Sequence, residues 1–175
     1  MKRGILRFLA FAGAVAVLAG GLKILSWIPA VAQKDVLREY ADVEEARATT
    51  SIGKIFVPSY FPQNLAWPPS RILAQGKPFP ALIMEFEKVG GKEVALLISQ
   101  SASEDFSSAG KVRMLEVTES VPYPLKGRDA LLEVGVCERD EPCAGISWRE
   151  GTYRIVVRAR TTPFELIKIA ESMLK

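Results

Sequence analysis

The chain contains no histidine and only two cysteines among its 175 residues. Without histidine there is no Ser–His–Asp triad, no histidine-ligated zinc and no c-type haem motif. The two cysteines, Cys137 and Cys143, are too few to form a zinc site on their own. The glycine pairs at 20–21 and 90–91 do not form a phosphate-binding motif. The sequence therefore excludes several common catalytic chemistries and predicts no bound metal or cofactor.

An excess of positive charge is found only near the N-terminus. The whole chain carries a formal charge of +3, and residues 1–32 hold four basic residues and no acidic one. Residues 33–175 hold 19 basic and 20 acidic residues and are nearly neutral. Because nucleic-acid-binding domains carry a basic face, this balance predicts no nucleic-acid partner.

Residues 1–33 are predicted to be a membrane anchor or a secretory signal. A basic start is followed by the uncharged run Phe8–Leu22, and the stretch to Ala32 contains one lysine, Lys23. As a helix, residues 8–32 span about 37 Å, enough to cross a bilayer core of about 30 Å. Ala30 and Ala32 also match a cleavage site before Gln33. The long distance from the uncharged run to this site favours the anchor.

Both interpretations place the rest of the chain outside the cytoplasm, because the basic residues precede the apolar run. We expect a single-pass protein of a bacterial cytoplasmic membrane, with its N-terminus inside and its domain in the periplasm or extracytoplasmic space. Residues 8–32 would contact the bilayer. Cleavage after Ala32 would instead release a secreted periplasmic protein.

Residues 34–53 are predicted to form a juxtamembrane helical segment. Apolar residues recur at spacings of three or four over Val36–Ala48, which is typical of a helix. Asp42 and Glu45 also resemble a capping box, which would divide the stretch into two short helices.

Residues 54–175 are predicted to form an extracytoplasmic α+β domain. Pro58–Pro80 carries six of the eleven prolines and is expected to be extended and irregular. A final helix is expected to begin at Pro163, after an N-cap at Thr162 that forms a capping box with Glu165. This order predicts an antiparallel sheet with N-terminal and C-terminal helices packed on it. Alternating patterns and turn signals predict its strands at Lys54–Val57, Leu82–Glu87, Glu93–Gln100, Arg113–Val121, Ala130–Cys137, Gly145–Arg149 and Tyr153–Arg160.

Cys137 and Cys143 lie five residues apart between two predicted strands. Outside the cytoplasm the expected state is a disulfide, which in so short a loop stabilises by about 2 kcal/mol. A redox-active pair is the alternative, but the spacing is not C-x-x-C. The three acidic residues between the cysteines would also raise a thiol pKa rather than lower it.

The stretch Val57–Pro69 combines aromatic and proline side chains at high density. Rigid apolar side chains of this kind suit a partner surface, so the candidate binding residues are Tyr60, Phe61, Trp67, Pro68 and Pro69. The alternative is that Tyr60, Phe61 and Trp67 cover an open edge of the domain's own core. The sequence leaves both interpretations open.

Two C-terminal stretches carry a resemblance to known proteins. In Trp148–Ile155 a tryptophan, an acidic–glycine turn and a tyrosine strand follow one another, and Thr162–Leu174 is a capped helix ending in Ala-x-Ser-hydrophobic. With the proline pair Pro58 and Pro62, these residues resemble an uncharacterised bacterial extracytoplasmic domain family. That family is similar to the sigma-factor regulators of the MucB/RseB type and distantly to periplasmic lipoprotein carriers.

The resemblance covers residues 42–175 and implies an antiparallel sheet with a C-terminal helix. It brings no catalytic residues. The Cys137–Cys143 loop and Trp67-Pro68-Pro69 depart from the family pattern.

No spacing of carboxylates or serines marks a catalytic group, so we do not expect an enzyme. The leading hypothesis is a membrane-anchored accessory protein whose extracytoplasmic domain docks on a membrane protein complex. The alternative, which the resemblance favours, is a lipid- or lipoprotein-binding sensor or carrier. It would hold an acyl chain against the sheet, where the apolar side chains of residues 82–98 would either line a cavity or fill the core.

Overall fold

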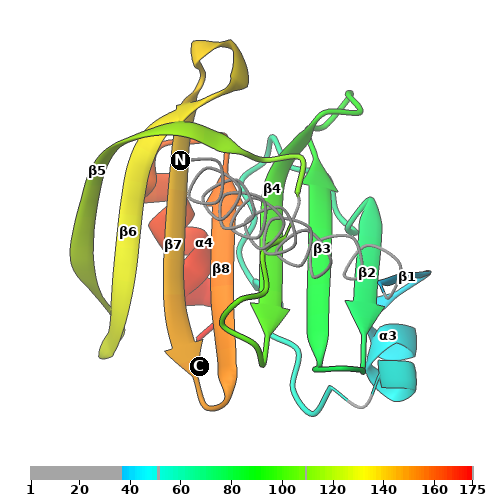
Figure 1. The fold of residues 1–175 in the computed structure, drawn as a ribbon. Helices are drawn as coiled ribbons and strands as arrows, with labels where there is room; N and C mark the ends of the chain where they lie inside the picture. Colours follow the sequence, from blue (N-terminus) through cyan, green and yellow to red (C-terminus); the bar gives the residue numbers. More distant parts are fainter. Residues whose placement is uncertain (1–36, 51, 109, 175) are drawn as a thin grey trace, which may run out of the picture. The chain divides into compact units, whose positions relative to one another are not determined.

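The computed structural model describes residues 37–50, 52–108 and 110–174, and most of them belong to one eight-stranded antiparallel sheet (Figure 1). The expected anchor or signal in residues 1–33 lies outside the described residues. In the part of the chain that is described, no helix has the length and apolarity needed to cross a bilayer.

The strands follow the order β1-β2-β3-β4-β8-β7-β6-β5, so β8 returns to the middle of the sheet and pairs with β4. Among the described residues, two α-helices accompany the sheet, α3 (Val43–Thr50) and α4 (Pro163–Ser172). This confirms the predicted α+β class with an antiparallel sheet. The strands are β1 (Arg38–Tyr40), β2 (Arg71–Gln75), β3 (Ala81–Glu87), β4 (Val94–Ser101), β5 (Met114–Leu125), β6 (Arg128–Cys137), β7 (Pro142–Glu150) and β8 (Tyr153–Ala159).

One face of the sheet holds the main hydrophobic core. Alternate residues of each strand point to this face, and α4 lies behind β7 and β8 (Figure 1). Leu166, Ile169 and Ala170 of α4 are fully buried there, together with Ala46 of α3. The fully buried strand residues of this core include Leu82, Met84, Phe86, Leu96, Ile98, Ile155 and Val157.

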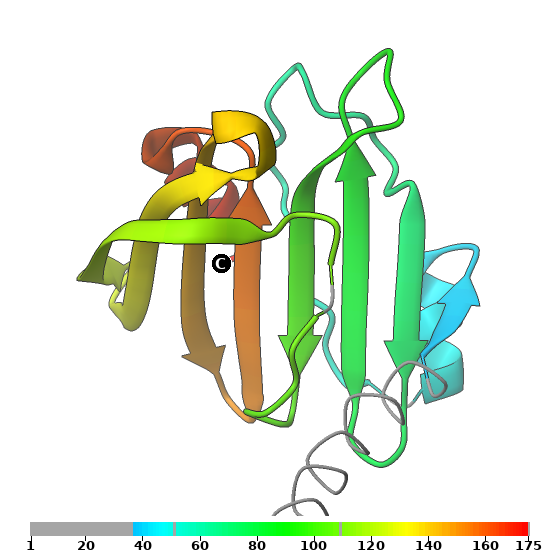
Figure 2. The same ribbon diagram turned by 45° about the horizontal axis from the view of Figure 1, so that its top comes forward.

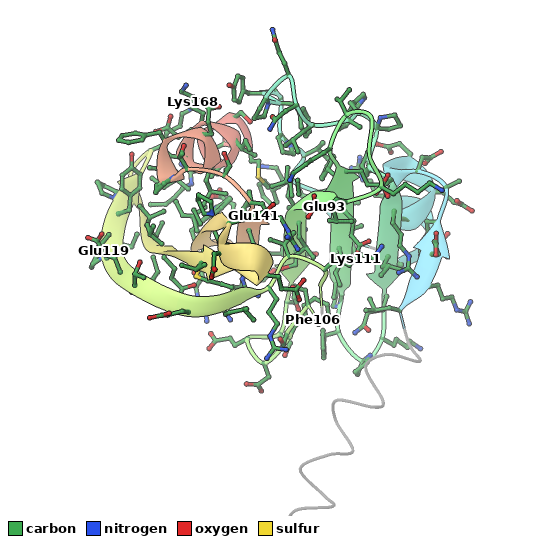
Figure 3. The ribbon with its side chains drawn as sticks, turned by 90° about the horizontal axis from the view of Figure 1, so that it is seen from above. Glu93, Phe106, Lys111, Glu119, Glu141 and Lys168 are labelled. Atoms are coloured by element: carbon green, nitrogen blue, oxygen red, sulfur yellow. A yellow bond between two sulfur atoms is a disulfide. The ribbon has the colours of Figure 1, made fainter. Side chains whose placement is uncertain are left out.

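The opposite face is crossed by the chain between β4 and β5. We call residues 102–108 and 110–113 the strap, and β5 continues from it across β7 and β8 (Figure 2). Seen from above, α4 with Lys168 lies on one side of the sheet, and Phe106 and Lys111 of the strap lie on the other (Figure 3). The two faces of the sheet are therefore covered by different segments, α4 on one face and the strap with β5 on the other.

Both edges of the sheet are short or irregular. β1 has three residues, and it pairs with β2 only. β5 at the other edge is longer, but its register with β6 shifts between Met114 and Glu116 and again between Val117 and Glu119. Pro122 and Pro124 follow in the same strand.

The helix expected over Val36–Ala48 is wrong in its first half. Residues Arg38–Tyr40 form β1, which pairs with β2 and is joined to it by an ion pair between Glu39 and Arg71, with 3.0 Å between Oε2 and Nε. The helix begins only at Val43. The predicted cap by Asp42 is confirmed, because Asp42 Oδ1 accepts the Glu45 N–H at 2.7 Å. The reciprocal bond is shifted by one residue, since Glu45 Oε2 accepts the N–H of Ala41 rather than that of Asp42, at 2.8 Å.

Lys54–Val57 is not a strand, contrary to the prediction. A single side chain replaces the expected ladder: the amide of Gln100 accepts the Phe56 N–H at 3.1 Å and donates to the Lys54 carbonyl. The segment Pro58–Pro80 is also not irregular throughout. The proline-free stretch Arg71–Gln75 within it forms β2, where every backbone donor is present.

The final helix begins at Pro163 as predicted, with Thr162 at the N-cap. The Thr162 side chain makes no capping hydrogen bond, and the Glu165 carboxylate binds Tyr60 and Lys168. The expected capping box is therefore wrong, while the position of the helix start is right.

Candidate interaction surface

Residues Pro58–Ser70, which we call the proline–aromatic segment, are irregular but firmly held by the sheet. The Ala66 N–H donates to the Glu87 carbonyl at 2.8 Å, the Val89 N–H to the Asn64 carbonyl at 2.9 Å, and the Ser70 N–H to the Glu85 carbonyl at 2.8 Å. These bonds fasten the second half of the segment to β3 and to the turn that follows it.

The first half of the segment is fastened to α4. The Ser59 hydroxyl donates to the Ser172 carbonyl at 3.0 Å, and the Tyr60 hydroxyl donates to Glu165 Oε2 at 2.9 Å. The segment therefore links both ends of α4 to the sheet, and its backbone has a defined course despite its prolines.

The aromatic side chains of the segment divide between the core and the surface. Phe61 is half-buried and packs on the core residue Phe86, with ring centroids 5.2 Å apart. Trp67 packs on Phe61 at 4.9 Å and on Phe86 at 6.1 Å, yet 56% of its surface stays exposed. Phe61 thus covers the core, while Trp67 leaves a large apolar surface open to solvent.

The other predicted binding residues are exposed to different degrees. Tyr60 is 38% exposed and Pro68 is exposed, whereas Pro69 is half-buried. Together with Trp67 they leave apolar side chains of a fixed segment accessible to solvent.

Sequence reasoning missed one exposed aromatic residue, Phe164. It lies in the first turn of α4, next to the Glu165 that Tyr60 contacts, and it is 77% exposed. A signal was present in the sequence: Phe164 falls outside the apolar stripe of the helix, where a polar residue would be expected. We therefore add Phe164 to the candidate surface, which consists of Tyr60, Trp67, Pro68, Pro69 and Phe164.

Electrostatic contacts fix Tyr60 against α4. The Lys168 ammonium lies 2.8 Å from Glu165 Oε1, and this contact, followed by the hydrogen bond from Tyr60, lowers the pKa of Glu165. The same carboxylate raises the pKa of Tyr60 through its hydrogen bond and raises the pKa of Lys168. Near neutral pH these shifts favour the ionised carboxylate of Glu165, the protonated hydroxyl of Tyr60 and the charged ammonium of Lys168, which are the forms that make these contacts.

Cys137 and Cys143 lie away from this surface, in the loop between β6 and β7. Their sulfur atoms are at bonding distance, 2.10 Å, in agreement with the predicted disulfide. The loop between them supplies Glu141 to Arg160, whose side chain is 6% exposed, with 3.2 Å between Oε2 and Nη1. Glu93 of the β3–β4 hairpin contacts the same Nη1 at 3.1 Å. The disulfide loop is thus tied to the centre of the sheet through a buried arginine.

The residues that would line an acyl-chain cavity are instead part of the packed core. Leu82, Met84, Phe86, Leu96 and Ile98 are fully buried and belong to one cluster with α4. The carboxylate of Glu85 is buried on the opposite face and forms an ion pair with Lys111 at 3.2 Å. Within the described residues, no group of three or more metal-ligating side chains is found.

Comparison of the chain with protein-family models, with curated proteins and with solved structures finds no match.

Proposed function

We propose that the chain is a non-catalytic, membrane-anchored accessory protein whose domain docks on a membrane protein complex through Trp67, Tyr60 and Phe164. The observation that carries this proposal is the exposure of these rings on a backbone that is already fixed. Binding then orders few additional groups, so less of the interaction free energy is lost to conformational entropy. Tryptophan and tyrosine are also enriched among the residues that dominate binding energies.

The apolar segment at residues 8–32 supports a partner in or on the membrane. An anchor of this kind confines the domain to the bilayer surface, which raises its effective concentration near other membrane proteins. A modest docking surface is then sufficient for a stable complex.

The test is a comparison of variants of the full-length chain, extracted gently from its own membrane. In the double variant Trp67→Ala/Phe164→Ser, loss of the two rings is expected to weaken partner binding about 30-fold or more, the effect of removing about 2 kcal/mol of contact energy. Size and composition of the purified complex measure this loss. Phe61 is left unchanged because it packs on the core.

Leu115→Ser provides the matched control. Leu115 is 61% exposed, but it lies on β5 and far along the chain from the candidate surface. This variant should retain the complex, and circular dichroism should show that both variants fold. Equal retention of the complex by the folded double variant would contradict the proposal. A small species that carries a stoichiometric lipid would favour the sensor or carrier instead.

A further inference from the structure

The strap is held to its face of the sheet along most of its length. At its start the Ala102 N–H donates to the Pro80 carbonyl at 3.0 Å. In its middle, Phe106 is buried and contacts the ring of Phe79 edge-on, with centroids 5.9 Å apart. At the end of the strap, the Lys111 ammonium forms an ion pair with the buried Glu85 at 3.2 Å. The backbone carbonyl of Lys111 accepts a hydrogen bond from Arg160 Nη2 at 3.3 Å.

The strap also lies very close to the sheet at Gly110. A Cβ added there would lie 1.9 Å from Leu97 Cδ1, so a larger residue would require either the Leu97 side chain or the strap to shift. The contacts on both sides leave Ser107 and Ser108 between fixed points. Within the described residues neither serine hydroxyl makes a hydrogen bond.

A cleft of about 400 Å³ opens between this part of the strap and β8. Its walls contain two arginines, two serines, a glycine and a valine, and no acidic residue: Ser107, Ser108, Gly110, Val112, Arg113 and Arg158. The volume is within the range of small-molecule sites. The chemistry of the lining is that of a site for a small anion.

Arg113 and Arg158 differ from most arginines of the domain in their partners. Arg71 and Arg128 each pair with a glutamate, and Arg160 contacts several carboxylates. In the described part of the chain, neither Arg113 nor Arg158 forms an ion pair with a carboxylate. Two guanidinium groups thus share one cleft whose lining contains no carboxylate.

We propose that this cleft binds a small ligand through an oxyanion, either a phosphate or a carboxylate group. Arg113 and Arg158 would each present a planar guanidinium fork, which matches the geometry of both groups, and the hydroxyls of Ser107 and Ser108 would donate to the remaining oxygens. The site lies on the face opposite the α4-side core, so it is independent of the docking surface.

Two neighbouring features limit where the anion sits. Glu133 of β6 and Arg158 both border Gly145, since the position of a Gly145 Cβ is 3.6 Å from both Glu133 Oε2 and Arg158 Cγ. A second, smaller cleft of about 120 Å³ shares Ser107, Ser108 and Arg158, but Glu104 and Asp105 contribute to its walls. Their negative charge would repel an oxyanion, so the oxyanion is expected in the larger cleft.

The experiment is a calorimetric titration of the full-length chain in detergent with inorganic phosphate and, separately, with citrate. Saturable binding with a dissociation constant of about 1 mM or lower is expected for at least one probe. Arg158→Ala and Arg113→Ala are each expected to weaken it tenfold or more. Glu133→Gln should strengthen it, because a nearby negative charge is removed. The probe that binds more tightly identifies the ligand as a phosphate or a carboxylate.

Arg38→Ala is the matched control. Arg38 is an exposed arginine on β1 that likewise forms no ion pair within the described residues, and it does not line the cleft. Its variant should bind as the unchanged protein does. The proposal is overturned if neither probe saturates, or if Arg38→Ala weakens binding as much as the cleft variants do. Arg113 is exposed, so its variant keeps the test valid if Arg158→Ala fails to fold.

Discussion

Gly135 and Gly145 lie on adjacent strands and on the same face of the sheet, but a side chain at each would meet very different surroundings. A Cβ on Gly135 would lie 1.9 Å from the carbonyl oxygen of Glu116, a backbone atom in the irregular part of β5. A Cβ on Gly145 would have its nearest neighbours at 3.6 Å, an ordinary contact distance. Gly135 is therefore required by the close approach of β5, and Gly145 is not.

We expect Gly135→Ala to lower the free energy of unfolding by about 1–3 kcal/mol, because a backbone carbonyl has to move to admit the methyl group. Gly145→Ala should change it by less than about 1 kcal/mol, with a small gain from reduced freedom of the unfolded chain. Urea denaturation of the full-length protein in detergent measures both. Equal stability of the two variants would show that β5 can shift at little free-energy cost where its register is irregular.

At the residue scale, sequence reasoning succeeded where only neighbours along the chain matter. Asp42 accepts the Glu45 N–H and Glu45 accepts the Ala41 N–H, and all three residues lie within five positions of the chain. Thr162 and Glu165 have the same spacing, yet Glu165 binds Tyr60, which is 105 residues away. Tyr60 and Lys168 occupy the Glu165 carboxylate, and the spacing between Thr162 and Glu165 carries no information about either partner.

At the scale of elements, the junction between α4 and the proline–aromatic segment depends on the charge of Glu165. Its pKa is lowered below the ordinary value of 4.5, first by Lys168 and then by Tyr60. A lowered folded-state pKa means that this contact stabilises the fold above the unfolded-state value and that the contribution is lost as the pH falls through the folded-state value.

We expect Tyr60→Phe to raise the pKa of Glu165 partway toward 4.5 and Lys168→Met to raise it further, following the order of the two causes. NMR titration of the Glu165 side-chain carboxyl carbon in the full-length protein measures both shifts. An unchanged pKa in Tyr60→Phe would mean that the hydroxyl does not hold the carboxylate in solution.

The strands that the sequence predicted best are those with a turn signal between them. Glycine pairs or acidic–glycine turns mark the β3–β4 and β7–β8 hairpins, and alternation identifies their arms. β1 was missed because three residues are too few to show a period of two. The strand predicted at Lys54–Val57 is an extended stretch held by the Gln100 side chain, and no pattern distinguishes a side-chain amide from a backbone partner.

At the scale of the whole molecule, the sheet is most deeply buried in its middle. β3, β4 and β8 contribute fully buried side chains to the core on one face, and the strap lies on the other face. β1 and β5 each have a single neighbour. The opening of local structure should therefore require far more free energy at the centre than at the edges.

Amide hydrogen exchange of the full-length protein tests this gradient. We expect the amides of Met84, Ile98 and Val157 to exchange about a thousandfold or more slowly than those of Glu39 in β1 and Glu119 in β5. Rapid exchange at Ile98 or Val157 would show that the central strands open independently of the core.

The candidate surface was partly predictable from the sequence. Density of prolines and aromatics identified Tyr60 and Trp67, but it gave no means of separating them from Phe61, which is half-buried against Phe86. Which of these rings is buried depends on the position of β3 beneath the proline–aromatic segment. The cleft residues Arg113 and Arg158 are 45 positions apart, and only the course of the strap brings them together.

The edges of the sheet have a consequence for how the protein behaves when crowded. A growing fibril needs a long strand with unbroken backbone donors to template the next chain. β1 offers three residues, and β5 offers two shifts of register and two prolines that lack an N–H. Folded copies of this domain packed side by side are therefore poor seeds for amyloid-like growth, although the sheet between the edges is rich in apolar side chains.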